Sequence, residues 1–153
     1  MEYVSGGTAN CFAKALAAKP ENEGHVPEWA IARITKGVAS ALSYLHKKRI
    51  VHGDIKDDNI LITSFEVVKL TDFGQAVTID PNVGLTECCW GTSQHRVPEL
   101  MSNTVGHMLS SKRMWRKCGT PVDVWALGVT MSELTTPNEI DFEIFPHYGM
   151  QPS

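Results

Sequence analysis

The feature that most constrains the fold is an amphipathic segment at residues 27–49. Apolar residues recur along it with helical spacing, at Ile31, Ile34, Val38, Leu42 and Leu45. This spacing places them on one face of an α-helix, which must be buried against the rest of the chain. Pro27 suits the first turn of a helix, and the cations at 47–49 suit its C-terminal end. We therefore expect a long helix here.

Three further elements follow from local patterns. Residues 8–19 predict a short Ala-rich helix that ends before Pro20, and residues 121–136 predict a buried helix opened by Pro121. The segments "NILIT" and "EVVKL" flank Ser64-Phe65, which predicts two short strands joined by a tight turn. The expected chain is mainly α with one small β-hairpin.

Composition limits the classes of function. The chain has 153 residues, enough for one domain with a real core, and its formal net charge of -3 creates no field that attracts nucleic acid or an anionic membrane. No apolar run approaches the roughly 20 residues of a membrane helix, and the first ten residues carry no secretory signal pattern. The four cysteines lack metal-ligand spacing and are interpreted as reduced thiols, which indicates a cytoplasmic protein.

The stretch "VHGDIKDDNILI", residues 51–62, concentrates chemically useful side chains directly before an apolar strand. Asp54 can orient a hydroxyl and accept its proton, and Lys56 can neutralise charge on a phosphoryl group. Asn59 and Asp72 supply oxygen ligands that suit Mg²⁺. The hairpin between them can return Asp72 to the side of Asn59, so one ion could contact both. Each piece alone is typical of a solvated turn. The set, in this order, indicates a Mg²⁺-nucleotide clamp.

These motifs resemble those of eukaryotic-type protein kinases, specifically the C-terminal lobe. "HGDIKDDN" is similar to the catalytic loop, "DFG" to the metal-binding motif, "GTSQHRVPE" to the end of the activation segment, and "MEYVSGGT" to the hinge. "VDVWALGV" resembles the central helix of that lobe. The resemblance covers the chain from residue 1 to about residue 134. Lys56 and Thr92 are similar to residues that are typical of serine/threonine kinases, and the sequences around "HGDIKDDN" and "DFG" are most similar to the STE group.

The resemblance implies a role for each matching residue. His52 and Phe73 would stack in an internal hydrophobic spine, and Asp123 would hold the backbone of the catalytic loop. The remaining assignments are Asp54, Lys56 and Thr92 as catalytic residues; Glu2, Val4, Leu61 and Lys56 at the ATP, with residues 1–4 as the hinge edge; and Asn59 and Asp72 as Mg²⁺ ligands.

The resemblance also implies a fold class and a division of the chain. The expected fold is mainly α with a small β-hairpin, a partial kinase C-lobe with the N-lobe absent. Residues 1–7 would be a hinge-like segment, residues 8–136 a partial C-lobe, and residues 137–153 an unassigned remainder. An apolar face would then be exposed on the last helix, with Val124, Leu127, Val129 and Leu134 as its candidates.

Two departures from the family pattern bear on activity. Gly53 stands where the family has an Arg that pairs with a phosphorylated activation segment, so that switch has no receiver here. The sequence also holds no glycine-rich loop, strand Lys or helix Glu of the kind that orients ATP phosphates in kinases. We therefore expect very low activity of this chain alone.

Two functions remain open. The first is a serine/threonine protein kinase that uses ATP and Mg²⁺, with a protein serine or threonine as substrate. The alternative is a catalytically incompetent kinase-like module that binds other proteins, including one that covers the exposed apolar face. No nucleic acid or membrane partner is expected. The basic stretch "SKRMWRKCG", residues 111–119, is interpreted as a solvated insertion, with an acidic partner or nucleic acid as its alternative.

Overall fold

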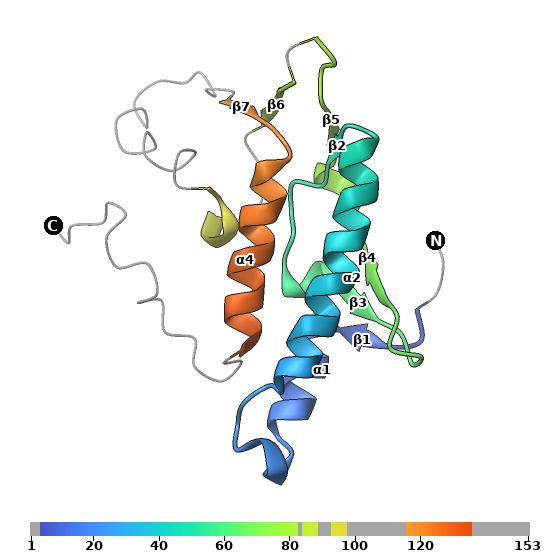
Figure 1. The fold of residues 1–153 in the computed structure, drawn as a ribbon, viewed down its shortest axis with the longest axis vertical. Helices are drawn as coiled ribbons and strands as arrows, with labels where there is room; N and C mark the ends of the chain where they lie inside the picture. The colour runs from blue at the N-terminus through green and yellow to red at the C-terminus, as the bar shows by residue number, and fades with distance from the viewer. Residues whose placement is uncertain (1–3, 83, 89–92, 98–115, 136–153) are drawn as a thin grey trace, which may run out of the picture.

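The computed structural model describes residues 4–82, 84–88, 93–97 and 116–135. Figure 1 shows helices α2 and α4 running side by side, with a small sheet on the other flank of α2. The helices are α1 (Ala9–Ala17), α2 (Glu28–Lys47) and α4 (Pro121–Thr135), with short 3-10 turns η1 (Pro20–Asn22), η2 (Asp57–Asn59), η3 (Phe73–Gln75) and η4 (Ser93–His95). The strands are β1 (Gly7–Thr8), β2 (Ile50–Val51), β3 (Ile60–Ile62), β4 (Val68–Leu70), β5 (Val77–Thr78), β6 (Thr86–Cys88) and β7 (Arg116–Cys118).

Helix α2 confirms the amphipathic prediction. Ile34, Val38, Leu42 and Leu45 are buried, and Ile31 is partly buried against the same core. The helix ends at Lys47, and Arg49 then adopts a positive φ of 60° that turns the chain into β2. This turn brings the polar stretch after residue 51 back across the inner side of the helix.

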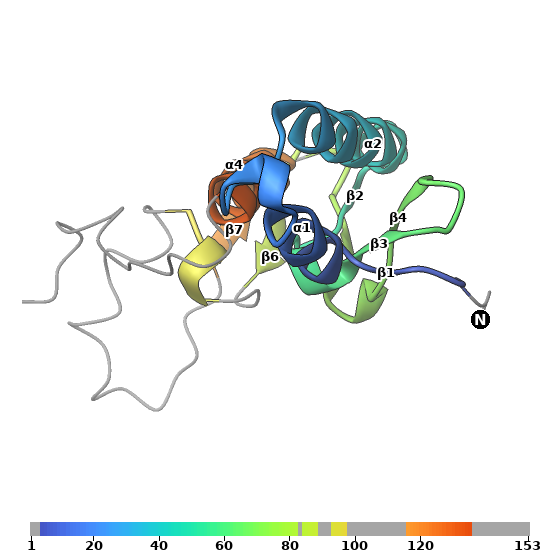
Figure 2. The same cartoon turned by 90° about the horizontal axis from the view of Figure 1, so that it is seen from below.

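The two other helices also form where their patterns predict them. Thr8 caps α1, because its Oγ1 accepts a hydrogen bond from the backbone N–H of Cys11 at 3.3 Å. Helix α4 begins at Pro121, a favoured first position. Seen along the helices in Figure 2, α1 lies beside both α4 and the strands of the small sheet.

The expected apolar surface on α4 is mostly wrong. Leu127 and Val129 are each 8% exposed and Leu134 is 2% exposed. Only Val124, at 59%, is open to solvent among the four candidates. The helix packs against α1, α2 and η4. The expected need for a protein that covers this face therefore loses most of its basis.

The hairpin is as predicted, but it belongs to a larger sheet. Strands β3 and β4 pair antiparallel with Ile60 opposite Leu70, and β1 pairs antiparallel with the other edge of β3. Gly6 permits this approach, because a Cβ at that position would lie 1.6 Å from the carbonyl oxygen of Ile62. Any side chain at Gly6 would force β1 away from β3.

The expected fold class, mainly α with one hairpin in a C-lobe-only fragment, is wrong. The described ranges hold seven strands in three small sheets, with orders β1-β3-β4, β2-β5 and β6-β7. Strands of two or three residues are too short for an alternating apolar pattern to be recognised. Except for β3 and β4, the pairs also join segments far apart in sequence, so neither strand signals its partner.

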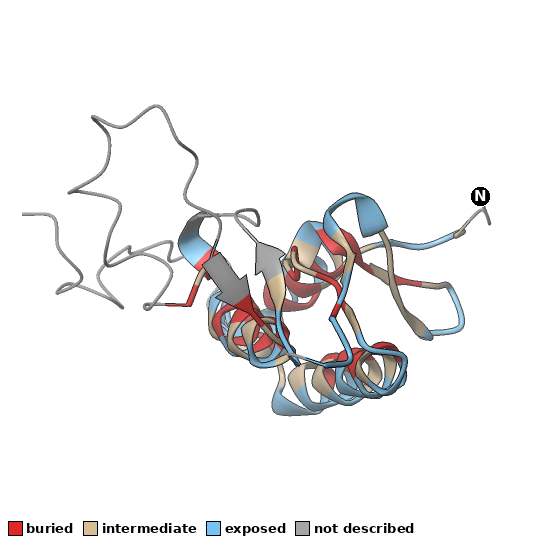
Figure 3. Cartoon of the chain, turned by 90° about the horizontal axis from the view of Figure 1, so that it is seen from above, coloured by how far each residue is buried: buried red, intermediate tan, exposed pale blue. Residues whose placement is uncertain are grey.

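Burial follows the inner faces of these elements. Figure 3 shows the buried residues gathered on the faces of the helices and strands that turn toward one another.

Cys11 carries a free, exposed thiol, whereas Cys118 is part of a disulfide, so the expectation of reduced thiols is wrong for Cys118. Within the described ranges, no helix combines the length and apolar character needed to cross a membrane.

Candidate active site

The backbone of the loop that follows β2 is held by a buried carboxylate. Asp123, at the start of α4, is 1% exposed. Its Oδ2 accepts the backbone N–H of His52 at 2.9 Å, and its Oδ1 accepts that of Gly53 at 2.9 Å. The Nε2 of His46, on α2, donates to the same Oδ2 at 2.8 Å. Asp123 therefore fixes the loop to two helices, as the sequence resemblance implied for its backbone.

Gly53 occupies a position that suits glycine. Its φ is 81°, in the left-handed region where a Cβ is disfavoured. In this conformation its backbone N–H donates to Oδ1 of Asp123. Glycine adopts it without steric cost.

His52 links this loop to the strand that precedes "DFG". It is fully buried, and its Nε2 donates to the carbonyl of Thr71 at 3.0 Å. Its Nδ1 then accepts the backbone N–H of Asp54 at 3.3 Å, so the two contacts define one neutral tautomer. The ring contacts that of Phe73 with centroids 4.9 Å apart, so the expected pairing is confirmed, but the rings are tilted by 59° rather than stacked and Phe73 is 49% exposed rather than internal.

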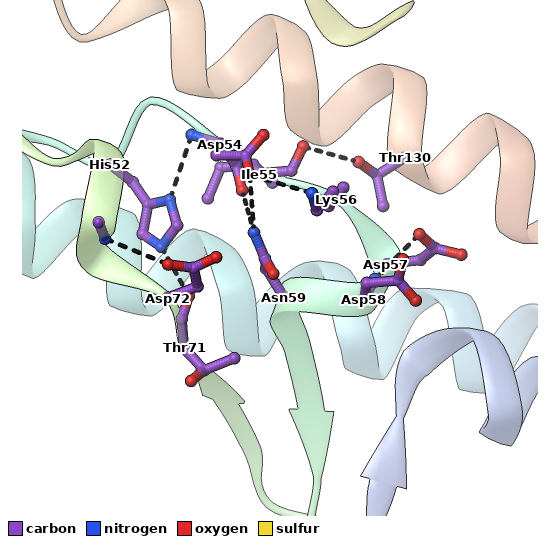
Figure 4. A network of polar contacts seen from close by, with 11 residues as sticks. His52, Asp54, Ile55, Lys56, Asp57, Asp58, Asn59, Thr71, Asp72 and Thr130 are labelled. Carbon is purple, nitrogen blue, oxygen red and sulfur yellow. Dashed lines mark hydrogen bonds and ion pairs between the residues drawn. The ribbon is translucent and has the colours of Figure 1, made fainter. Parts of the chain in front are cut away.

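Asp54 is the centre of the polar cluster. It is 9% exposed, and its Oδ2 lies 3.1 Å from the ammonium of Lys56. The amide nitrogen of Asn59 donates to the same Oδ2 at 3.1 Å and to the Asp54 carbonyl at 2.9 Å. Figure 4 shows the three side chains meeting at one point of the loop, beside α4. An amide and a cation thus hold one carboxylate oxygen in a fixed position.

Asp72 is brought to this cluster by the hairpin. The backbone N–H of Thr71 donates to the carbonyl of Asn59 at 3.0 Å, which places Asp72 one residue from that contact. Asp72 has a φ of 59°, and its Oδ1 accepts the N–H of Gly74 at 3.2 Å. This left-handed turn directs the carboxylate back toward the loop (Figure 4).

The donor set fits Mg²⁺. The amide nitrogen of Asn59 is committed to Asp54, which leaves its Oδ1 for a cation, and Asp72 adds a carboxylate. Hard oxygen ligands of this kind, few in number and completed by water and phosphate, are what Mg²⁺ prefers. Among the described residues, no group of three or more His, Cys, Asp or Glu side chains could form a different metal site.

The structure places some other expected site residues and not others. Leu61 lies in β3 opposite Thr8 of β1, and Val4, three residues before the start of β1, is partly buried. Glu2 and Thr92 lie outside the described residues, as do the rest of the proposed hinge edge before Val4 and most of the basic stretch.

Two residues of the site were not expected from sequence. His46 falls four residues after Leu42, on the inward stripe of α2, and this position could have signalled a buried contact. Thr130 lies within the apolar run of α4; it is fully buried, and its hydroxyl lies 2.8 Å from the carbonyl of Ala126 and 3.4 Å from that of Ile55. Thr130 thus contacts the loop around Asp54 directly, whereas His46 contacts Asp123, which holds that loop.

Comparison with known proteins identifies the family of this chain. The model of the protein kinase domain family matches residues 1–144. The chain is 34% identical over 137 residues to mitogen-activated protein kinase kinase kinase 15 of Mus musculus, covering 89% of this chain and 9% of that protein. It is 35% identical over 136 residues to serine/threonine-protein kinase SKM1 of Saccharomyces cerevisiae, covering 88% and 19%. A probable serine/threonine-protein kinase of Dictyostelium discoideum is 38% identical over 152 residues, covering 99% and 26%.

The chain spans less than a third of the length of each of these relatives. A match over residues 1–144, with three sheets among the described elements, does not support a C-lobe-only fragment. The relatives include a mitogen-activated protein kinase kinase kinase, a MAP kinase kinase and another serine/threonine kinase, which confirms the resemblance to serine/threonine kinases near the STE group. This chain belongs to the protein kinase domain family.

Proposed function

We propose that this chain supplies the catalytic loop and the metal ligands for phosphoryl transfer from Mg-ATP to a protein serine or threonine. The observation that carries the proposal is the contact of Lys56 and Asn59 with one oxygen of the buried Asp54. Phosphoryl transfer depends mainly on positioning and charge stabilisation, and this cluster provides a fixed carboxylate beside a cation.

Each residue has a separate part in the proposed reaction. Asp54 orients the substrate hydroxyl and accepts its proton, and Lys56 stabilises negative charge on the phosphoryl group. Asn59 and Asp72 hold the metal, which when bound neutralises charge on the phosphate oxygens. Thr92 is proposed to brace Asp54 and Lys56, by resemblance alone.

The nucleotide base is assigned by resemblance and by strand pairing. Leu61 lies under the proposed adenine site on β3, and the backbone of Glu2 and Val4 forms its edge. The β1–β3 pairing at Thr8 and Leu61 supports this assignment, because it holds the segment after Val4 next to Leu61. Lys56 would contact the phosphates at the other end.

The rate of the isolated 153-residue chain is proposed to be low. The sequence contains no G-x-G-x-x-G pattern to cover the phosphates, and positioning supplies much of the rate in this reaction. The alternative function, a module that binds proteins without catalysis, requires the same fold but no nucleotide. Nucleotide binding therefore separates the two functions.

The test is a thermal unfolding series of the whole chain with Mg-ATP. Binding to the folded state adds about 2.7 kcal/mol to the free energy of unfolding when the Mg-ATP concentration is 100 times Kd, and this raises the melting temperature. Asp72→Asn is expected to abolish the shift, and Asp80→Asn, an exposed carboxylate elsewhere, is expected to keep it. No shift at millimolar Mg-ATP in the wild-type chain would favour the protein-binding module.

A further inference from the structure

A disulfide lies at the end of the ribbon formed by β6 and β7. Cys118, the last residue of β7, is disulfide-bonded and 4% exposed. Cys11 is free, and the only other cysteines of the sequence are the adjacent Cys88 and Cys89. The two strands pair antiparallel, with Thr86 opposite Cys118. By elimination, the disulfide joins β7 to the last residue of β6 or to the residue directly after it.

Strand β7 connects the disulfide to the proposed catalytic loop through α4. Only two residues separate β7 from this helix, and the carbonyl of Thr120 accepts the backbone N–H of Asp123 at 3.2 Å. Asp123, five residues after Cys118, holds the backbone of residues 52 and 53. Figure 1 shows β7 running directly into the first turn of α4. The bridged end of β7 is therefore close in sequence to the residue that fixes the loop before Asp54.

Strand β6 connects the disulfide to the same loop from the other side. The turn before β6 is closed by two hydrogen bonds, from the N–H of Gly84 to the carbonyl of Asp80 at 2.8 Å and from the N–H of Asp80 to the carbonyl of Leu85 at 3.3 Å. Before this turn, β5 pairs with β2, with Val77 opposite Val51, and β2 runs into the catalytic loop. The loop, α4, the ribbon, β5 and β2 thus form a ring that the disulfide closes.

Two observations favour a regulatory bond over a purely structural one. Whichever of Cys88 and Cys89 bonds to Cys118, the other thiol is its neighbour in sequence, and redox-sensing cysteines often have such a resolving thiol beside them. Gly53 has no side chain, so it cannot hold the segment after "DFG" by pairing with a phosphorylated residue. A covalent bond holds this segment without a charge at that position.

We propose that the Cys118 disulfide is a redox switch, which holds the catalytic loop in place when oxidised and loosens it when reduced. The regulation rests on the proposed phosphoryl transfer, because the loop carries Asp54, Lys56 and Asn59. The geometry of these three residues belongs to the oxidised chain, which is therefore the more active state. Reduction opens the ring and leaves Asp123 attached to a β7 that is no longer tied to β6.

The switch uses a dithiol as reductant and hydrogen peroxide as oxidant. One thiolate of the dithiol attacks the sulfur of the partner cysteine, because Cys118 is shielded, and the Cys118 sulfur leaves with the bonding electrons and takes up a proton. The second thiol then displaces the partner cysteine as a thiol, and the dithiol becomes a cyclic disulfide. In the reverse direction, peroxide oxidises the partner thiolate to a sulfenic acid and releases hydroxide. The Cys118 thiol then forms the S–S bond and water leaves.

The first experiment counts thiols in the whole chain without nucleotide. The folded chain is treated with limiting hydrogen peroxide or with dithiothreitol, then alkylated in denaturant and weighed. One disulfide among four cysteines leaves two thiols to alkylate after peroxide and four after dithiothreitol. Peptide mapping should find Cys118 joined to Cys88 or Cys89. A bridge that includes Cys11, or a bond that resists dithiothreitol in the folded chain, would overturn the switch.

The second experiment follows hydrogen exchange in the two redox states. Reduction should speed exchange about 10-fold at residues 84–88 and 116–118, and less at residues 51–54, because the cross-link restricts local opening. Cys118→Ser should show the reduced rates in both states. The double variant Cys88→Ser/Cys89→Ser should do the same, and it keeps the test informative if Cys118→Ser does not fold. Cys11→Ser, which changes a free and exposed thiol, is the matched control and should keep the full response. Equal rates in both states, or an equal rise over the whole chain, would overturn the proposal.

The third experiment connects the switch to activity. Reduction should lower kcat/KM for a serine- and threonine-containing protein about 10-fold, since small displacements of a catalytic group cost at least that much, and peroxide should restore it. Cys118→Ser should stay at the reduced value under both treatments. Equal activity in both states would overturn the regulation. A wild-type chain that binds no Mg-ATP in either state would refute the proposed function, and the exchange experiment would then decide the switch alone.

Discussion

Asp123→Asn tests most directly how the loop before Asp54 is held. The wild-type carboxylate accepts three hydrogen bonds, from two backbone N–H groups and the His46 ring, at 2.8–2.9 Å. Oδ2 takes two of these contacts and Oδ1 takes one. An asparagine has a single acceptor oxygen, so its best orientation keeps two contacts and turns an NH₂ group toward the remaining donor.

The magnitude follows from that loss. A hydrogen bond to a charged group contributes about 1.5–3 kcal/mol, and a buried donor left without a partner adds a desolvation cost. Asp123 is 1% exposed, so water cannot replace the lost acceptor. We expect the free energy of unfolding to fall by about 2–4 kcal/mol. This loss is a large part of the roughly 5–15 kcal/mol by which a typical domain is stable against unfolding. Asp123→Ala would be a less informative variant, because it removes all three contacts at once.

The assay is urea unfolding monitored by circular dichroism, with hydrogen exchange at residues 51–54. A lower midpoint with an unchanged slope indicates lost stability rather than a changed denatured state. Asp80→Asn serves as control, because Asp80 is exposed and accepts one local hydrogen bond from Asn82 at 2.7 Å. It should change the unfolding free energy by less than about 0.5 kcal/mol. If Asp123→Asn changes it as little, Asp123 does not hold the loop in the way the structure indicates.

Three further predictions concern packing and use the same urea assay. Gly37→Ala should destabilise by about 1–2 kcal/mol despite the better helix propensity of alanine, because its Cβ would lie 2.5 Å from that of Val68; no loss would show that β4 can move away freely. Gly128→Ala, in the other long helix with nothing within 4 Å of its Cβ, should instead stabilise by about 0.5–1 kcal/mol, and a loss would contradict that open space. Glu66→Ala should cost less than about 1 kcal/mol, because its ion pair with Arg33 is about half exposed, and a larger loss would show that this pair fixes the hairpin to α2.

The long elements and the loop contacts could be predicted from sequence. The apolar stripe of α2 and the β3–β4 hairpin depend on local periodicity and turn residues, which the sequence shows directly. The contact of Asp123 with the loop and the packing of His52 on Phe73 came from family resemblance, since the residues of each contact lie far apart in sequence.

The small sheets and the burial of α4 could not be predicted. The pair Ile50–Val51 and Val77–Thr78 is only two residues long on each side, so no alternation is visible in either strand. The exposure expected for Leu127 and Leu134 assumed that nothing in this chain covers α4, whereas α1, α2 and η4 pack against it. Which elements meet is a tertiary property that apolar composition alone does not specify.

The polar residues of α4 are more informative about function than its apolar ones. An almost wholly apolar helix indicates burial, and a buried polar side chain requires a partner. Asp123 and Thr130 are seven residues apart, two turns, and therefore lie on one face of α4, where both reach the loop that carries Asp54. Glu133 lies three residues beyond Thr130 and reaches His95. The same helix that closes the core thus also holds, through its two buried polar residues, the loop that carries the proposed catalytic carboxylate.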